Sequence, residues 1–119
     1  RGVSNRVSMS GNSDFPLEED VYFPGNGWDR TEARWAQSPM AHLGQAKTPT
    51  LIIHSEGDLR CNIEQSEQVF TALQLRGIPS RFVRYPRSTS HGMSRNGPPD
   101  LRLHRLGEIL SWWKKYLHA

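Results

Sequence analysis

The sequence predicts an α/β fold whose parallel sheet is only partly contained in the chain. Residues 50–54 form a short, nearly continuous apolar run that is typical of a strand, residues 81–85 are expected to form a second strand, and each is followed by a stretch with helical periodicity. Strands that are apolar on both faces and joined through a helix are typical of a parallel sheet. Because two strands do not make a stable parallel sheet, we expect further strands to come from another segment or from a second chain.

The first 47 residues have the composition of a loop-rich region. Gly, Pro, Asn and Asp are frequent over residues 11–30, and residues 3–10 fit a short strand or its exit. We expect a short helix over residues 31–37, ended by Ser38-Pro39, because proline disfavours helix in the residue before it. A loop-dominated segment of this length is unusual in a self-sufficient domain, so we interpret it as connections of a larger sheet.

Strand, helix, strand and helix then follow in order. After the first strand, Asn62 is predicted to cap a helix with Gln65 at capping-box spacing, and Gly77 is predicted to end it as the C′ residue. The second strand closes at Pro86. The apolar positions of this first helix are Ile63, Val69, Phe70 and Leu73, with Ser66 on the same face.

A last helix is predicted to start with Asp100 as its cap. Lys114 and Lys115 lie in its final turns, where they suit the helix dipole. Right-handed crossovers would place both helices over the faces of the sheet. One apolar face of this last helix has spacings of three and four residues and comprises Leu103, Leu106, Leu110, Trp113 and Leu117.

Composition limits the functional classes. The chain has 119 residues, enough for one domain or part of one. Its composition, with 35% hydrophobic and 23% charged residues, indicates a globular protein. The net charge is +3, and the basic residues are scattered rather than gathered in the stripe that a nucleic-acid site needs. No apolar run approaches the roughly 20 residues that span a bilayer. We therefore expect neither a nucleic-acid partner nor a membrane partner.

The single cysteine, Cys61, excludes an internal disulfide and fits a reducing compartment, so we expect a cytoplasmic location. Residues 1–14 lack the apolar core of a signal peptide. The chain does not begin with methionine, and we interpret residues 1–119 as a piece of something longer.

Asp58 and His91 are the candidates for chemistry. Each follows the end of a predicted strand, and the carboxyl ends of neighbouring parallel strands meet at one edge of a sheet. An aspartate there can accept a hydrogen bond from one nitrogen of the imidazole, which fixes the ring's tautomer for proton transfer. The chain contains no G-x-S-x-G nucleophile elbow, and the nearby serines Ser8, Ser10 and Ser13 do not form one. The pair is therefore two-thirds of a catalytic triad.

Each candidate also has a simpler interpretation. Asp58 is equally suited to forming a turn or capping a helix, and a histidine beside glycine in a polar loop, as at His91, is often only exposed. Arg60 has the fork of donors that binds a substrate carbonyl or carboxylate, or it forms a surface ion pair. Glu56 fits a solvated turn carboxylate better than a second acid.

The remaining histidines and the cysteine do not indicate a metal site. His54 lies inside an apolar strand and is expected to be a satisfied core histidine. Cys61 is expected to be a small buried thiol. The other three histidines, which have no ligand-spaced neighbours, are His42, His104 and His118.

Three segments carry a resemblance to a known family. They are TPTLIIHSEGDLRCNIEQSEQVFTALQLRGIPSRFVRYP, SHGMSRNGPP and RLGEILSWWKKYL. Together with SNRVSMSGNSD and WAQSP, they resemble the C-terminal end of serine peptidases of the prolyl oligopeptidase family, in the acylaminoacyl-peptidase-like branch. The chain departs from the family pattern at Ser55 and Ser90, where small glycine-like residues are common, and at Asn62, where proline is common. None of these departures removes a catalytic group.

The resemblance implies an α/β-hydrolase fold, a three-layer αβα arrangement of which residues 1–119 are the C-terminal part. It implies that Asp58 is the triad acid, His91 the base and Arg60 a residue that helps to hold the substrate. The nucleophile, the oxyanion-hole loop and a β-propeller would precede Arg1, consistent with the order serine, acid, histidine. It implies hydrolysis of short or N-acylated peptides without a cofactor.

Two alternatives remain at this point. The chain is also interpretable as a non-catalytic fragment or interaction module that binds through an exposed sheet edge. A lipase-like or carboxylesterase activity on the same fold is a further alternative, because a fold does not fix a substrate. The expected partners are a short peptide and the rest of the catalytic domain, with a second copy of the chain as another candidate.

Overall fold

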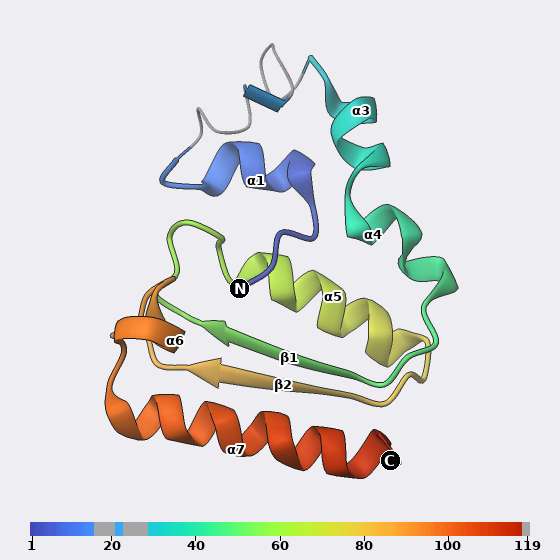
Figure 1. Ribbon diagram of the computed structural model, residues 1–119. Coiled ribbons are helices and arrows are strands. Elements are labelled where there is room, and N and C mark those ends of the chain that lie inside the picture. The colour runs from blue at the N-terminus through green and yellow to red at the C-terminus, as the bar shows by residue number, and fades with distance from the viewer. Residues whose placement is uncertain (16–20, 23–28, 118–119) are drawn as a thin grey trace.

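The computed structural model describes residues 1–15, 21–22 and 29–117. In this part of the chain the sheet has two parallel strands, β1 (Thr50–Ser55) and β2 (Ser80–Tyr85). The register runs from Thr50 opposite Ser80 to Ser55 opposite Tyr85. Figure 1 shows both strands pointing to the same edge. Both predicted strands and their parallel pairing are confirmed, and each strand is one residue longer than predicted.

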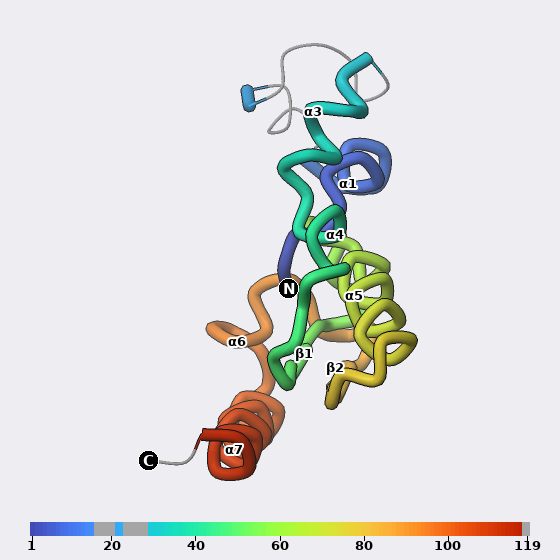
Figure 2. Tube along the Cα trace, turned by 90° about the vertical axis from the view of Figure 1, so that its right-hand side faces the viewer, coloured from blue at the N-terminus to red at the C-terminus, as the bar shows by residue number. Residues whose placement is uncertain are grey.

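Two helices cover the opposite faces of the strands. Helix α5 (Glu64–Leu75) connects β1 to β2, and α7 (Pro99–Tyr116) follows the second strand (Figures 1 and 2). A hydrophobic cluster lies on the α5 side and a second one on the other side, so both faces of the strands bury apolar side chains. The buried members of the first cluster are Ile52, Leu73 and Ile78, and those of the second are Val83, Tyr85 and Met93.

Helix α5 ends as the sequence predicts. Gly77 has φ +67°, which the other residue types rarely adopt, and its N–H donates to the carbonyl of Gln74 at 3.0 Å. The N–H of Ile78 donates to the carbonyl of Leu73 at 3.0 Å, which completes a Schellman motif. Leu73 and Ile78 also share the first hydrophobic cluster, so the cap is part of the core.

The predicted capping box of α5 is wrong. The helix begins one residue later, with Ile63 at the N-cap position, although the Oδ1 of Asn62 still accepts from the N–H of Glu64 at 3.1 Å. Gln65 does not reach back to the cap. Its side chain is fully buried and instead accepts the N–H groups of Ser4 and Asn5, because tertiary contacts with the N-terminal segment take precedence.

Helix α7 differs from expectation at its start. It begins at Pro99, whose fixed φ suits the first helical position, so Asp100 lies in the first turn rather than at the cap. The residues on its predicted apolar face, Leu103, Leu106, Leu110, Trp113 and Leu117, do share a face but are between 51% and 71% exposed.

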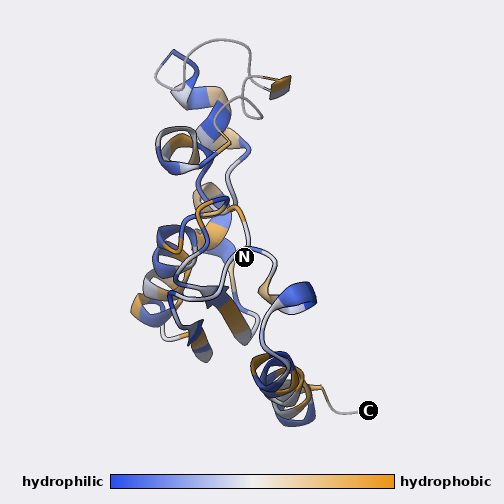
Figure 3. Ribbon diagram, turned by 90° about the vertical axis from the view of Figure 1, so that its left-hand side faces the viewer, coloured by the Kyte–Doolittle hydropathy of each residue, from blue (hydrophilic) through white to orange (hydrophobic). Residues whose placement is uncertain are grey.

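The half-buried apolar residues of α7 are instead Leu101, Ile109, Trp112 and Tyr116, and Leu101 packs on the second cluster. Neighbouring strands lie about 4.8 Å apart, whereas an α-helix with its side chains is roughly 10 Å wide. A sheet of two strands is therefore too narrow to bury all the apolar side chains of α7. Hydrophobic residues therefore lie around much of α7 (Figure 3).

The N-terminal segment is more helical than predicted. Residues 3–10 do not form a strand, because α1 (Arg6–Asn12) begins there and the side chain of Asn5 caps it by accepting from the N–H groups of Val7 and Ser8. The predicted short helix is α3 (Thr31–Ala36), followed by α4 (Pro39–His42) and the 3₁₀ helix η1 (Leu43–Gln45). Residues 16–20 and 23–28 of the predicted loops, and His118, lie outside the described residues.

Candidate active site

Asp58 and His91 meet at the carboxyl edge of the two strands. Asp58 lies in the turn after β1, and His91 lies in the loop after β2. The Nδ1 of His91 is 3.0 Å from Oδ2 and 3.2 Å from Oδ1 of Asp58. The structure thus brings together the two residues that the sequence indicated, at hydrogen-bond distance.

Gly57 lets the two loops approach this closely. A Cβ at residue 57 would lie 2.2 Å from the carbonyl oxygen of Arg87 and 2.5 Å from that of Thr89. Thr89 is buried, and its hydroxyl donates to the carbonyl of Pro86 at 2.7 Å, which fixes the start of the His91 loop. A side chain at position 57 would therefore push apart the acid turn and the histidine loop.

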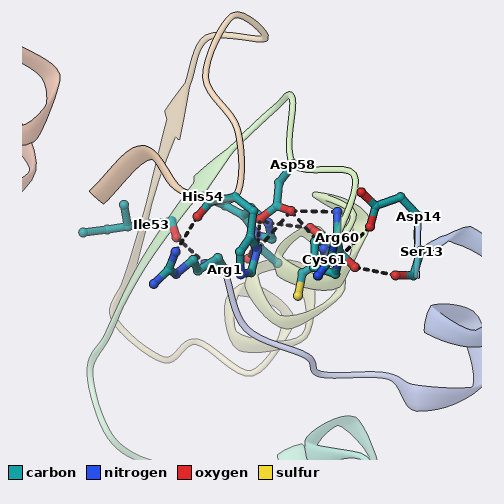
Figure 4. A network of polar contacts seen from close by, with 10 residues as sticks. Arg1, Ser13, Asp14, Ile53, His54, Asp58, Arg60 and Cys61 are labelled. Carbon is teal, nitrogen blue, oxygen red and sulfur yellow. Dashed lines mark hydrogen bonds and ion pairs between the residues drawn. The ribbon is translucent and has the colours of Figure 1, made fainter. Parts of the chain in front are cut away.

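The carboxylate of Asp58 is fully buried and surrounded by donors. Its Oδ1 accepts the backbone N–H groups of Arg60 at 3.0 Å and Cys61 at 2.9 Å. Its Oδ2 lies 3.2 Å from Nε2 of His54, a residue of β1 (Figure 4). With His91, the two oxygens have four donor groups around them, so the orientation of the carboxylate is closely determined.

These contacts keep Asp58 ionised. Burial alone would raise its pKa, but the hydrogen bond from His54, then the N–H of Cys61 and the ring of His91 outweigh burial and lower the pKa to about 2. Asp58 is therefore an anion at neutral pH, the state that a partner of a proton-transferring imidazole requires.

His54 is a buried histidine whose ring nitrogens both have hydrogen-bond partners, as predicted. Its contact with Asp58 was not predicted. It is 1% exposed, and its Nδ1 lies 2.6 Å from the hydroxyl oxygen of Ser66 on α5. Its Nε2 lies 2.8 Å from the carbonyl oxygen of Cys61 and also faces Asp58. The only sequence signal for this contact is the four-residue separation of His54 and Asp58 across a turn, and no pattern indicated Ser66 or Gly57.

His91 leaves one ring nitrogen available. Its side chain is 34% exposed, and among residues 1–15, 21–22 and 29–117 its Nε2 has no hydrogen-bond partner. The short helix α6 (Met93–Asn96) follows directly, and buried Met93 anchors it in the second hydrophobic cluster. In the neutral ring, a hydrogen on Nδ1 directed at Asp58 leaves the lone pair of Nε2 to act as a general base.

Arg60 is turned toward the N-terminal segment. Its Nε lies 2.6 Å from Oδ1 of Asp14, and its guanidinium carbon lies 5.0 Å from the ring centroid of Phe15. Glu56 is exposed and pairs with Arg84 at 3.1 Å, as expected for a solvated turn carboxylate. The side chain of Arg60 thus forms a surface ion pair in this structure, while its backbone N–H donates a hydrogen bond to Asp58.

The three serines near the N-terminus are engaged elsewhere. The hydroxyls of Ser10 and Ser13 donate to backbone carbonyls, and that of Ser8 faces the carbonyl of Asn5 and the carboxylate of Glu64.

In the part of the chain that is described, no three His, Cys, Asp or Glu side chains are grouped to hold a metal, and no helix is long and apolar enough to cross a membrane. Cys61 is buried, as predicted.

The chain is similar to known peptidases in sequence. The chain matches the prolyl oligopeptidase family over residues 1–119. It is 40% identical to an uncharacterized peptidase, YuxL, of Bacillus subtilis over 98% of this chain and 18% of that protein. It is 36% identical to dipeptidyl-peptidase 5 of Aspergillus oryzae over 79% of this chain and 13% of the relative.

A solved structure has the same fold. The acylaminoacyl peptidase of Pyrococcus horikoshii superposes with a TM-score of 0.89 at 26% identity, over 98% of this chain and 19% of that one. The fold is that of the α/β-hydrolase peptidases, as predicted. The chain spans less than a fifth of the length of these relatives.

Proposed function

The chain belongs to the prolyl oligopeptidase family of peptidases, and from this premise we propose that it supplies the acid and the base of a serine-peptidase triad. The observation that carries the proposal is the 3.0 Å contact between the buried Asp58 carboxylate and Nδ1 of His91, whose other ring nitrogen is open. The nucleophilic serine comes from outside these 119 residues, because no G-x-S-x-G occurs in them.

The proposed chemistry is acyl transfer in two steps. Nε2 of His91 accepts the proton as the serine hydroxyl attacks the substrate carbonyl, and the ring then donates it to the leaving amine. Asp58 stabilises the imidazolium that exists between these events. Water repeats the sequence on the acyl-enzyme, and backbone N–H groups of the remaining domain stabilise the oxyanion in both steps.

The rest of the catalytic domain is the proposed partner of this chain. A groove of about 690 Å³ runs beside β1 and α7, and His91 is among its lining residues. Its wall includes Leu51, Ile53 and Trp113, and the exposed apolar face of α7 lies beside it. Apolar surface of this extent normally packs against other protein. The coverage of less than a fifth of the relatives supports the same interpretation.

The proposed substrates are short or N-acylated peptides. The support is the kinship with proteins named as an acylaminoacyl peptidase and a dipeptidyl peptidase. Arg60, two residues after the acid, is proposed to bind a substrate carbonyl or carboxylate through its guanidinium. Asp14 and Phe15 would orient the guanidinium for that contact. A cytoplasmic location stays a prediction.

Active-site labelling tests the proposal. The full-length protein should react with a fluorophosphonate at a serine upstream of Arg1 and release the N-terminal residue from acyl-peptides. The 119-residue chain alone should remain unlabelled under the same conditions. Labelling of the isolated chain would contradict the account, and so would a full-length protein that hydrolyses p-nitrophenyl esters but no peptide, which is the carboxylesterase alternative.

A second candidate is a non-catalytic interaction module. The observation in its favour is the exposure of the α7 face together with the groove at β1. An autonomous module should give a monodisperse chain with a cooperative melting transition, whereas an excised part of an enzyme should aggregate or behave as a molten globule. Analytical ultracentrifugation and thermal melting of the 119-residue chain separate the two.

A further inference from the structure

We propose that His54 is a positioning residue for the reaction, which holds the Asp58 carboxylate in the orientation that His91 requires. The inference rests on the proposed triad and adds a second histidine to it. His54 is not a catalytic residue in this account, because it lies behind Asp58 and is fully buried.

The protonation of the His54 ring follows from its neighbours. Nε2 lies 2.8 Å from the carbonyl oxygen of Cys61, which can only accept a hydrogen bond, so Nε2 carries a hydrogen. In the neutral ring Nδ1 then accepts from the hydroxyl of Ser66, 2.6 Å away. The hydrogen on Nε2 is shared between Cys61 and Oδ2 of Asp58, at 3.2 Å, and both partners attract it.

The arrangement connects three elements. His54 belongs to β1, Ser66 to α5, and Asp58 to the turn between them. Because a strand and a helix fix the ring from both sides, the ring can transmit its position to the carboxylate. Asp58 in turn contacts His91, from the loop after β2.

The two oxygens of Asp58 are held differently. Oδ1 is fixed by two backbone N–H groups, those of Arg60 and Cys61, in addition to the longer 3.2 Å contact with Nδ1 of His91. Among the described residues, Oδ2 accepts from the rings of His54 and His91 alone, and His91 is the one whose protonation changes during turnover. Without His54, the contact with His91 alone would keep Oδ2 in place while the backbone N–H groups hold Oδ1.

The electrostatics agree with this geometry. Among the hydrogen bonds that lower the pKa of Asp58 against the effect of burial, that of His54 is the largest. The other titratable groups that face Asp58 are His91, the thiol of Cys61 and the amino group of Arg1. None of these donates a hydrogen bond to Oδ2 from the buried side of the carboxylate, where His54 lies.

The test compares three variants of the full-length protein with the wild type. His54→Leu removes the donor but keeps an apolar volume, and His54→Gln restores an N–H near the position of Nε2. Gln65→Leu is the matched control, since Gln65 is also fully buried and multiply hydrogen-bonded but has no contact with Asp58. Turnover is counted per serine titrated with fluorophosphonate, so that incomplete folding does not enter the rate.

The expected result is a drop in kcat of roughly 10- to 100-fold for His54→Leu, with KM within about threefold of the wild type. In the profile of kcat against pH, the acid limb of His54→Leu should shift to higher pH. Without the hydrogen bond from His54, the Asp58–His91 pair binds a proton more tightly. His54→Gln should recover most of kcat and the original acid limb. Gln65→Leu should lower the melting temperature without altering kcat or the limb.

Unchanged kcat and acid limb in His54→Leu, or equal impairment of the Leu and Gln variants, would overturn the inference. A parallel His91→Ala variant keeps the two proposals apart: if it is inactive while His54→Leu is normal, only the role of His54 fails. If His54→Leu does not fold, ¹⁵N NMR of histidine-labelled wild type decides. The His54 signals, assigned by their loss in His54→Gln, should show a protonated Nε2, and an unprotonated Nε2 would refute the donor.

Discussion

Oδ2 of Asp58 lies 3.0 Å from Nδ1 of His91, although the two residues are 33 positions apart and belong to different loops. The parallel pairing of β1 with β2 brings both loops to one edge of the sheet. The acid is buried and the base is partly open, which is the asymmetry that a proton-transferring pair needs. Substitutions in the full-length protein separate the contributions of the individual contacts in this arrangement.

Replacing Asp58 with asparagine should reduce kcat/KM by about 10³-fold or more. The amide would present N–H groups where His91 and His54 now find acceptors, so the His91 ring would favour the tautomer whose Nε2 cannot accept a proton. Glu56→Gln is the matched control, because that carboxylate is exposed and paired with Arg84. Peptidase assays of both variants check the prediction, and equal activity would show that Asp58 is only a turn former.

The acid stability of the protein should depend on Asp58. Its folded-state pKa of about 2 is below the usual value, so its ionisation stabilises the fold above roughly pH 4, and this contribution is lost as pH falls toward 2. The difference in melting temperature between wild type and Asp58→Asn should therefore be largest above pH 4 and shrink toward pH 2. A difference that stays constant over this range would contradict the pKa assignment.

Gly57→Ala should impair both stability and turnover. The added Cβ would meet backbone oxygens of the His91 loop at 2.2 and 2.5 Å, so the loop must move away from Asp58. We expect a loss of roughly 1–3 kcal/mol in unfolding free energy, together with a lower kcat. Gly44→Ala is the control, since nothing lies within 4 Å of a Cβ there. A wild-type kcat in Gly57→Ala would show that turnover does not depend on the close approach of the Asp58 turn and the His91 loop.

Arg60→Ala should raise KM by roughly tenfold while kcat stays within about threefold, if the guanidinium contributes a charged hydrogen bond to the substrate. Arg81→Ala is the control, because Arg81, at the start of β2 and away from the carboxyl edge, forms an ion pair with Glu108 of α7 at 2.8 Å. Steady-state kinetics with an acyl-peptide measure both. An unchanged KM in Arg60→Ala would leave Arg60 with its ion pair to Asp14 and no substrate role.

Much of the fold was predictable because local signals agree with it. The nearly continuous apolar run at residues 50–54 predicts β1, the aromatic and β-branched residues before Pro86 indicate β2, and Gly77 predicts the end of α5, where only a residue tolerant of positive φ fits. The position of Asp58 and His91 after two parallel strands was sufficient to predict that they lie at one edge.

The rest depends on contacts that no local pattern contains. The predicted strand at residues 3–10 is replaced by helix α1 (Arg6–Asn12) because Asn5 caps this helix and buried Gln65 holds its start, a contact across 60 positions. The bond from His54 to Asp58 and the approach of the Gly57 turn to the His91 loop exist only in three dimensions.

The most direct test of the account is the turnover of His91→Ala beside His42→Ala, a substitution of an exposed histidine on α4. Both variants should fold, because His91 lies in a loop and His42 is exposed, and His91→Ala should melt at a slightly lower temperature because it loses the hydrogen bond to Asp58. If His91 is the general base, His91→Ala should lose about 10³-fold or more of kcat/KM on an acyl-peptide while His42→Ala keeps wild-type activity. Wild-type turnover by a folded His91→Ala protein would contradict it.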